Sequence, residues 1–252
     1  MSTRFQLSVC PHDTAKHMVA WFQFNTYLQR KLDCGIHFEP KDSFILEQTA
    51  VLAGGFHITY ANPLSACTYI QELGFAPVAK PIGIYDETIL ISKAGAGVPQ
   101  HRPLTIASAS GEAIAHVLGL SLLDKLKIPR EECRFKFVDT HLKSIHTVLK
   151  GEADLAFVFD DTWHTLSEST RRELEVVAET NDQIAFHCFL IAPEWAARRD
   201  EIMNVLVGMK DDPKGRLILD SLDLQGFEPL SEDAIDTLQT LLVYYNTIYN
   251  AA

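Results

Sequence analysis

Polar residues that could bind an anion stand together at residues 108–111. Ser108, Ala109, Ser110 and Gly111 supply two hydroxyl groups and a glycine directly before a segment with helical character. Backbone N–H groups at the start of a helix attract anions, and glycine lets the backbone approach a ligand closely. The segment is therefore a candidate anion-binding turn, although Ser108 or Ser110 could equally be the N-cap of the helix.

His141 and the pair Asp160 and Asp161 follow two later strand-like segments, at 135–138 and 155–159. An imidazole can donate a hydrogen bond to an oxyanion. A carboxylate beside a bound anion is favourable only if it is protonated or if the ligand carries an amine, because two bare negative charges repel. The alternatives are a solvated loop position for His141 and an N-cap for Asp160.

Four further side chains offer hydrogen-bond donors near predicted strand ends. His12 follows the first strand, Tyr60 and Asn62 stand at the end of a later one, and Tyr85 lies on a long strand that connects two parts of the chain. Imidazole, hydroxyl and amide groups can each donate to an oxyanion. For the two tyrosines, a position in the hydrophobic core is an equally ordinary interpretation.

The elements that would position these residues alternate between strand and helix. Alternating apolar residues predict strands, and apolar residues at helical spacing predict the helices between them. Such alternation is typical of mainly parallel sheets flanked by helices, in which ligands bind beyond the carboxyl ends of the strands. The predicted strands are residues 5–10, 36–38, 56–60, 78–81, 104–107, 135–138, 155–159 and 174–178.

Two longer apolar strands, at 84–92 and 184–192, interrupt this alternation, and a loop with Gly95, Gly97, Pro99 and Pro103 follows the first. Glycine and proline mark loops, so the segment that contains these four residues is predicted to connect two parts of the fold. The prediction is two α/β lobes, residues 1–88 with 190–252 and residues 89–189, each a mainly parallel sheet flanked by helices, joined by two crossing strands. From residue 193 onward the chain is predicted to be helical.

Composition excludes several classes of function. The chain has 252 residues, 47% of them hydrophobic, and a formal net charge of -11, which opposes broad binding to nucleic acid or to anionic lipid. No apolar run is long enough for membrane insertion. The five cysteines have no CxxC pair and read as buried thiols. Without a signal-like N-terminus the expected location is the cytoplasm, or the periplasm if a signal has been removed.

Several segments together resemble the phosphate, phosphite and phosphonate substrate-binding protein family, the PhnD-like proteins. The most specific are THLKSIHTVLKGEADLAFV (140–158) and DDPKGRLILDSLDLQGFEPL (211–230), supported by YANPLSA (60–66), APVAKP (76–81), YDETILISKA (85–94) and SASGEA (108–113). The resemblance implies a two-lobed type II periplasmic-binding-protein fold and covers nearly the whole chain.

By that resemblance, Ser108 and Ser110 take the serine positions of an oxyanion-binding turn and His141 the position of a ligand-binding histidine. Asp160 or Asp161 takes that of an acidic residue, and Tyr85 looks like a hinge-strand tyrosine. Ala109 departs from the family pattern, which has threonine there.

The expected function is capture of a small oxyanion, such as phosphate, phosphite or a phosphonate, between two lobes. It would serve an ABC transporter permease or act as a ligand sensor for a signalling protein, without catalysis, cofactor or metal. Two alternatives remain open. One is an intracellular enzyme on the same fold that uses His141 and Asp160 or Asp161 as acid and base. The other is an interaction module that has lost its ligand.

Overall fold

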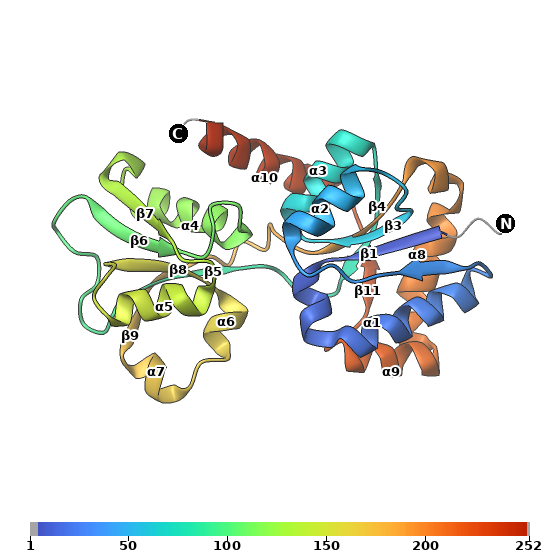
Figure 1. The fold of residues 1–252 in the computed structure, drawn as a ribbon, viewed down its shortest axis with the longest axis horizontal. Coiled ribbons are helices and arrows are strands. Elements are labelled where there is room, and N and C mark those ends of the chain that lie inside the picture. The colour runs from blue at the N-terminus through green and yellow to red at the C-terminus, as the bar shows by residue number, and fades with distance from the viewer. Residues whose placement is uncertain (1–4, 251–252) are drawn as a thin grey trace. The chain divides into compact units, whose positions relative to one another are not determined.

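The computed structural model describes residues 5–250, without the side chains of residues 232, 242, 245, 246 and 248–250. Within this range the chain forms two compact units. The first contains residues up to Ile84 together with those from Phe186 onward, and the second is Tyr85–Ala185. The predicted lobe boundaries, at residues 88 and 189, lie four residues after Ile84 and Ala185, where the chain changes unit in the structure. Each unit holds its own sheet and its own helices (Figure 1).

The first unit is built on a six-stranded mixed sheet with the strand order β11-β4-β10-β3-β1-β2. β1 pairs in parallel with β2 and β3, whereas β10 runs antiparallel to β3 and β4, and β11 antiparallel to β4. β11 is only three residues long and interrupts a region that was predicted to be helical. The strands are β1 (Phe5–Val9), β2 (Ile36–Phe38), β3 (Ile58–Ala61), β4 (Ala76–Pro81), β10 (Cys188–Ile191) and β11 (Phe227–Pro229).

Helices cover both faces of this sheet (Figure 1). On one face, Trp21 and Phe24 of α1 are buried against Phe189 of β10, with the rings of Phe24 and Phe189 stacked at 5.3 Å. Removal of these aromatic surfaces from water stabilises the unit. Its helices are α1 (Pro11–Lys31), α2 (Phe44–Leu52), α3 (Pro63–Leu73), α8 (Arg199–Val207), α9 (Pro213–Ser221) and α10 (Glu232–Asn250), with 3-10 turns at Pro193–Arg198 and Gly208–Asp211.

Several of these helices begin and end where their residue types predict. Ser43 caps α2 and Asn62 caps α3, each through a side-chain oxygen that accepts a backbone N–H. Gly74 ends α3 in the left-handed conformation, at φ 67°. The last helix, α10, packs on α3, where Cys67 Sγ donates to the Leu238 carbonyl oxygen at 2.6 Å. The C-terminal segment is therefore part of the first unit.

The second unit contains a five-stranded mixed sheet with the order β7-β6-β8-β5-β9. β6 pairs in parallel with β7 and β8, and β5 runs antiparallel between β8 and β9. Successive residues of β8 face opposite sides, so Phe157 meets α4 while Val158 packs with Ile145 of α5. The elements are β5 (Thr88–Lys93), β6 (Leu104–Ser108), β7 (Cys133–Phe137), β8 (Leu155–Phe159), β9 (Leu174–Glu179), α4 (Ile114–Lys125), α5 (His141–Leu149), α6 (Asp160–His164) and α7 (Glu168–Arg172), with a 3-10 turn at Arg130–Glu132.

Three details of the predicted architecture are wrong. Residues 84–87 and 184–187 are not strands, because the chain joins the second sheet only at Thr88 and the first sheet only at Cys188. The glycine- and proline-rich loop at 94–103 connects β5 to β6 inside the second unit, so the passages between units are the segments that precede β5 and β10. Both sheets are mixed, because β5 and β10 enter them in the opposite direction to their neighbours.

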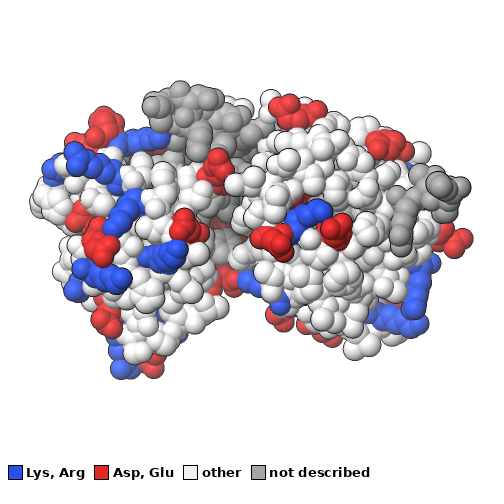
Figure 2. Space-filling view, in the orientation of Figure 1, with Lys and Arg blue, Asp and Glu red and all other residues white. Residues whose placement is uncertain are grey.

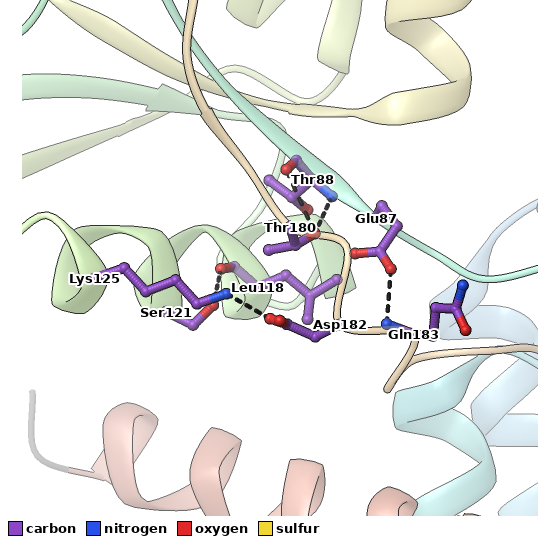
Figure 3. Close-up of polar contacts among 8 residues, drawn as sticks. All are labelled: Glu87, Thr88, Leu118, Ser121, Lys125, Thr180, Asp182 and Gln183. Carbon is purple, nitrogen blue, oxygen red and sulfur yellow. Dashed lines mark hydrogen bonds and ion pairs between the residues drawn. The ribbon is translucent and has the colours of Figure 1, made fainter.

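The two passages are tied to each other inside the second unit (Figure 3). The N–H of Thr88 donates to Thr180 Oγ1 at 2.8 Å, and the N–H of Thr180 donates to the Thr88 carbonyl oxygen at 2.9 Å. Beyond them, the N–H of Gln183 donates to Glu87 Oε1 at 3.0 Å. The two segments that connect the units are therefore hydrogen-bonded to each other where they leave the second unit.

Charged side chains of both signs are interspersed on the face of the molecule drawn in Figure 2, where the basic residues form no continuous surface among the residues described. Among residues 5–250, no helix combines the length and the apolar character needed to cross a membrane. All five cysteines are free thiols; Cys10, Cys67 and Cys188 are buried, as predicted, but Cys34 and Cys133 are only half-buried.

Candidate functional site

The turn at 108–111 leads from β6 into α4 without either serine capping the helix. α4 begins at Ile114, its N-cap is Ala113, and no side chain among the described residues caps it. The first N–H groups of a helix have no partner within the helix, and they carry the positive end of its dipole. The interpretation of Ser108 or Ser110 as an N-cap is therefore wrong.

The hydroxyl of Ser108 faces the interior of the second unit. Ser108 is fully buried, with Oγ 3.2 Å from Nδ1 of His116 and 3.4 Å from the Ser110 carbonyl oxygen. Burial is the largest cause that lowers the pKa of His116 to about 4, with a smaller contribution from Arg130, so its imidazole is neutral. The buried Ser108 side chain thus stabilises the turn from the interior of the second unit.

Ser110 and Gly111 lie at the half-buried surface of the turn. The Oγ atom of Ser110 accepts a hydrogen bond from the N–H of Glu112 at 3.1 Å. A hydroxyl group can accept such a bond and still donate its own hydrogen elsewhere. Of the two predicted serines, Ser110 is the one that can donate to a ligand.

His141 is brought to the same edge of the sheet as the turn. The N–H of Val138 donates to the Ser108 carbonyl oxygen at 3.0 Å, and that of Asp139 donates to the Ala109 carbonyl oxygen at 2.9 Å. α5 then starts at His141, which is half-buried and stacks on Phe159 with ring centroids 6.0 Å apart. The aromatic contact orients an imidazole beside the turn.

Asp160 and Asp161 follow β8, the other neighbour of β6. Asp160 is the first residue of α6, whose N-cap is Phe159, so the interpretation of Asp160 as an N-cap is wrong. Its Oδ1 accepts from the N–H of Asp161 at 2.7 Å. Burial is the main cause that raises the pKa of Asp160, and the charges of Asp86 and Asp161 raise it further. The hydrogen bond from the N–H of Asp161 opposes this rise, so the carboxyl group keeps its proton to a higher pH than an exposed aspartate does.

The predicted residues of the first unit are used mainly for its own structure. Tyr60 is only 3% exposed and packs between Trp21 and Phe189, with ring centroids 4.9 and 4.8 Å away. Asn62 Oδ1 accepts from the N–H of Ser65, and its Nδ2 donates to Ser65 Oγ, both at 3.0 Å. Tyr60 therefore belongs to the hydrophobic core, and Asn62 caps α3.

His12 and Tyr85 are half-buried residues of different units. His12 lies in the first turn of α1, next to Asp13. Tyr85 stands on the outgoing passage beside Asp86, whose N–H donates to the Ala185 carbonyl oxygen at 2.8 Å. Tyr85 is thus held on the paired segments and does not lie on a strand.

A shallow basic hollow lies over β7 and α5, lined in part by Lys136, Lys143, His146 and Lys150. Two of its lysines are already paired, Lys136 with Glu152 and Lys143 with Asp139, each at 2.8 Å. Exposed pairs of this kind leave little net positive charge for an anion. The hollow is a competing location that an experiment must separate from the turn.

Two mixed α/β units and a donor-lined sheet edge are the features of a solute-binding protein of the two-lobed periplasmic-binding type. The family model described as the periplasmic substrate-binding protein of phosphonate ABC transporters matches residues 7–235, and the chain belongs to that family. The resemblance in the sequence is thereby confirmed, and so is a solute-binding role. The family is one of substrate-binding proteins, normally periplasmic, and is not an enzyme class. No curated protein matches the sequence.

Solved structures confirm the predicted fold class. XAC2383 from Xanthomonas citri, bound to chloride ion, has a TM-score of 0.82 and 16% identity, with 100% of each chain covered. PhnD1 from Prochlorococcus marinus, in complex with methylphosphonate, has a TM-score of 0.74 and 13% identity, covering 97% of this chain and 98% of that one. The aliphatic sulphonate binding protein SsuA from Escherichia coli has a TM-score of 0.71 and 11% identity, covering 100% and 88%.

Proposed function

We propose that the protein binds a small oxyanion, of the phosphate, phosphite or phosphonate type, at the carboxyl edge of β6, β7 and β8 in the second unit. The observation that carries this proposal is the start of α4, which no described side chain caps, directly behind the Ser110 and Gly111 turn. Backbone N–H groups there, the Ser110 hydroxyl and the His141 imidazole would supply the donors.

Asp160 would act as a donor wherever its carboxyl group is protonated. Burial raises its pKa above 3.8, which widens the pH range in which this group can donate to an oxygen of the ligand. An ionised carboxylate at the same place would repel an anion, so Asp160 would favour a protonated, singly charged ligand over a doubly charged one. A site made from local donors also suits a chain whose net charge is -11.

The family adds a physiological context to the proposal. The relatives named for phosphonate and sulphonate bind tetrahedral oxyanions, and the family serves ABC transporters. We propose that this chain acts in the periplasm and presents its ligand to a transporter permease. A sensor that signals to another protein would use the same binding step.

Isothermal titration calorimetry with phosphate, phosphite, methylphosphonate, 2-aminoethylphosphonate and sulfate tests the proposal. A selective response to one ligand is expected, and Ser110→Ala and His141→Ala should each weaken it by roughly ten- to a hundred-fold, because hydrogen bonds to charged groups contribute about 1.5–3 kcal/mol. A thermal-shift measurement on the same ligands provides an independent signal of binding to the folded state.

Matched controls lie on the same two helices. Ser121 of α4 donates to the Leu118 carbonyl oxygen within the helix (Figure 3), and His146 of α5 is exposed in the basic hollow. Ser121→Ala and His146→Ala should leave the affinity unchanged. A loss in His146→Ala but not in His141→Ala would move the site to the hollow, and turnover of the ligand would replace the binding role by an enzymatic one.

A further inference from the structure

Three metal-ligating groups of the first unit converge at the carboxyl end of β1. The Cys10 thiol, the Asp13 carboxylate and the His187 imidazole each offer one ligand atom, and these atoms all lie within 4.8 Å of one another. The sequence separates Cys10 from His187 by most of the chain. Thiolate, imidazole and carboxylate are the three ligand types that zinc takes in proteins.

The fold fixes the backbone on both sides of the cluster. Cys10 continues β1, with its N–H donating to the Tyr60 carbonyl oxygen at 2.8 Å. Its own carbonyl oxygen accepts from the N–H groups of Asp13 and Thr14, both at 3.1 Å, which closes the first turn of α1. His187 directly precedes β10, and because β10 runs antiparallel to β3, its first residues lie at the carboxyl end of β3. Two strand ends thus bring the ligands together.

The distances suit tetrahedral coordination. Zinc–nitrogen and zinc–oxygen bonds are about 2.0–2.1 Å, which places two ligand atoms of a tetrahedron about 3.3–3.4 Å apart. His187 Nε2 and Asp13 Oδ2 are 3.3 Å apart. The Tyr60 ring stacks on the His187 ring, with centroids 5.6 Å apart and planes inclined by 26°, which holds the imidazole in place. The separation of these two atoms therefore matches that of two ligands of one metal ion.

All three ligand atoms are buried, although two of the side chains are partly exposed through their other atoms. Cys10 is 1% exposed, but the side chains of Asp13 and His187 are 23% and 13% exposed. Asp13 Oδ2 makes no hydrogen bond within the described residues and lies 3.3 Å from His187 Nε2, so a cation between the two atoms would be bound by both. Three protein ligands also leave a fourth coordination position open, as in zinc sites that bind water or a substrate.

We propose that Cys10, Asp13 and His187 form a binding site for a divalent transition-metal cation of the zinc type, with one position left for an exogenous ligand. The three ligands all belong to the first unit, so the site is independent of the oxyanion site proposed in the second. Thiolate and carboxylate together neutralise the two charges of the ion, and the neutral imidazole completes the protein ligands.

Cobalt titration of the full chain, after dialysis against a chelator, tests this proposal. Co²⁺ should bind at one equivalent with a near-ultraviolet thiolate-to-cobalt charge-transfer band, and Zn²⁺ should displace it. Cys10→Ser should abolish the band. Asp13→Asn and His187→Gln should keep the sulfur but weaken Co²⁺ binding by more than about a hundred-fold, since loss of outer-shell partners alone costs about 10- to 100-fold.

Cys34→Ser and Cys133→Ser are the controls, because both thiols are half-buried elsewhere in the chain and should leave the band unchanged. Circular dichroism shows which variants fold, and Zn²⁺ should raise the melting temperature of the wild type but not that of folded Asp13→Asn. Absence of cobalt binding, binding without the thiolate band, or a band that survives in Cys10→Ser would each overturn the proposal.

Discussion

Gly119, in the middle of α4, lets this helix pack closely on the sheet of the second unit. A Cβ atom at this position would lie 2.4 Å from Cγ and Cδ1 of Phe157. The Phe157 ring is fully buried between the rings of His116 and Phe135, at 5.6 and 6.2 Å, so it cannot swing aside without moving them. In a helix, glycine to alanine ordinarily stabilises by about 1 kcal/mol. Overpacking a core costs about 1–3 kcal/mol or more.

We therefore expect Gly119→Ala to lower the free energy of unfolding by about 2 kcal/mol, taking the upper overpacking cost less the gain in helix propensity. Denaturant titration followed by circular dichroism measures this change. Gly208→Ala is the control, since its Cβ would meet no described atom within 4 Å and its φ is negative; it should be neutral or slightly stabilising. Adding Phe157→Leu to Gly119→Ala should recover part of the loss.

A Gly119→Ala variant as stable as the wild type would refute the close packing of α4 on Phe157. The consequence would reach the candidate site, because the depth of α4 on the sheet sets where its N-terminus stands relative to Ser110. Oxyanion affinity measured on the same variant should fall together with stability. An unchanged affinity in a destabilised variant would show that the position of the helix start does not depend on this contact.

Two further predictions concern carboxyl groups whose pKa is raised. Burial raises the pKa of Glu47 above 4.5, against the opposing hydrogen bonds from Ser8 and Tyr69, so the unfolded state loses this proton at a lower pH than the folded state. The free energy of unfolding of the wild type should therefore fall relative to that of Glu47→Gln as pH rises from about 4.5 through the folded pKa. Urea titrations over that range measure the difference between the two proteins. A difference that does not change with pH would contradict the raised pKa of Glu47. Burial likewise raises the pKa of Asp160 above 3.8, so affinity for phosphite should weaken as pH rises through that raised pKa. Asp160→Asn, which keeps the acceptor for the N–H of Asp161, should flatten the dependence in calorimetry, and equal slopes would exclude Asp160 from the site.

Much of the fold follows from local signals in the sequence. The strands β1, β2 and β8 were predicted almost to the residue, since the pattern of apolar residues marks them. The direction of β5 and β10 within their sheets was not predictable in this way. It depends on how the chain returns from one unit to the other, and no local pattern encodes that path.

The candidate site was predictable in position more than in detail. The rule that ligands bind beyond the carboxyl ends of strands selects the turn at Ser110 and the start of α5 at His141. Whether a hydroxyl points outward depends on packing, and His116 turns Ser108 into the core. The cluster of Cys10, Asp13 and His187 gives no spacing signal, because β1 and β10, which bring its residues together, are far apart in the sequence and each pair with β3.

The same strand-end rule leads to opposite chemistry in the two units. In the first unit, Tyr60 packs in the core and Asn62 caps a helix. The other polar groups at that edge are a thiol, an imidazole and a carboxylate, which are ligand types for a cation. In the second, the helix start behind Ser110 has no side-chain cap among the described residues, and Ser110 and His141 are the groups there that we propose as donors to an anion. Because each set lies within one unit, chelation of a metal and loss of an oxyanion donor are separable perturbations, and the two proposals stand or fall independently.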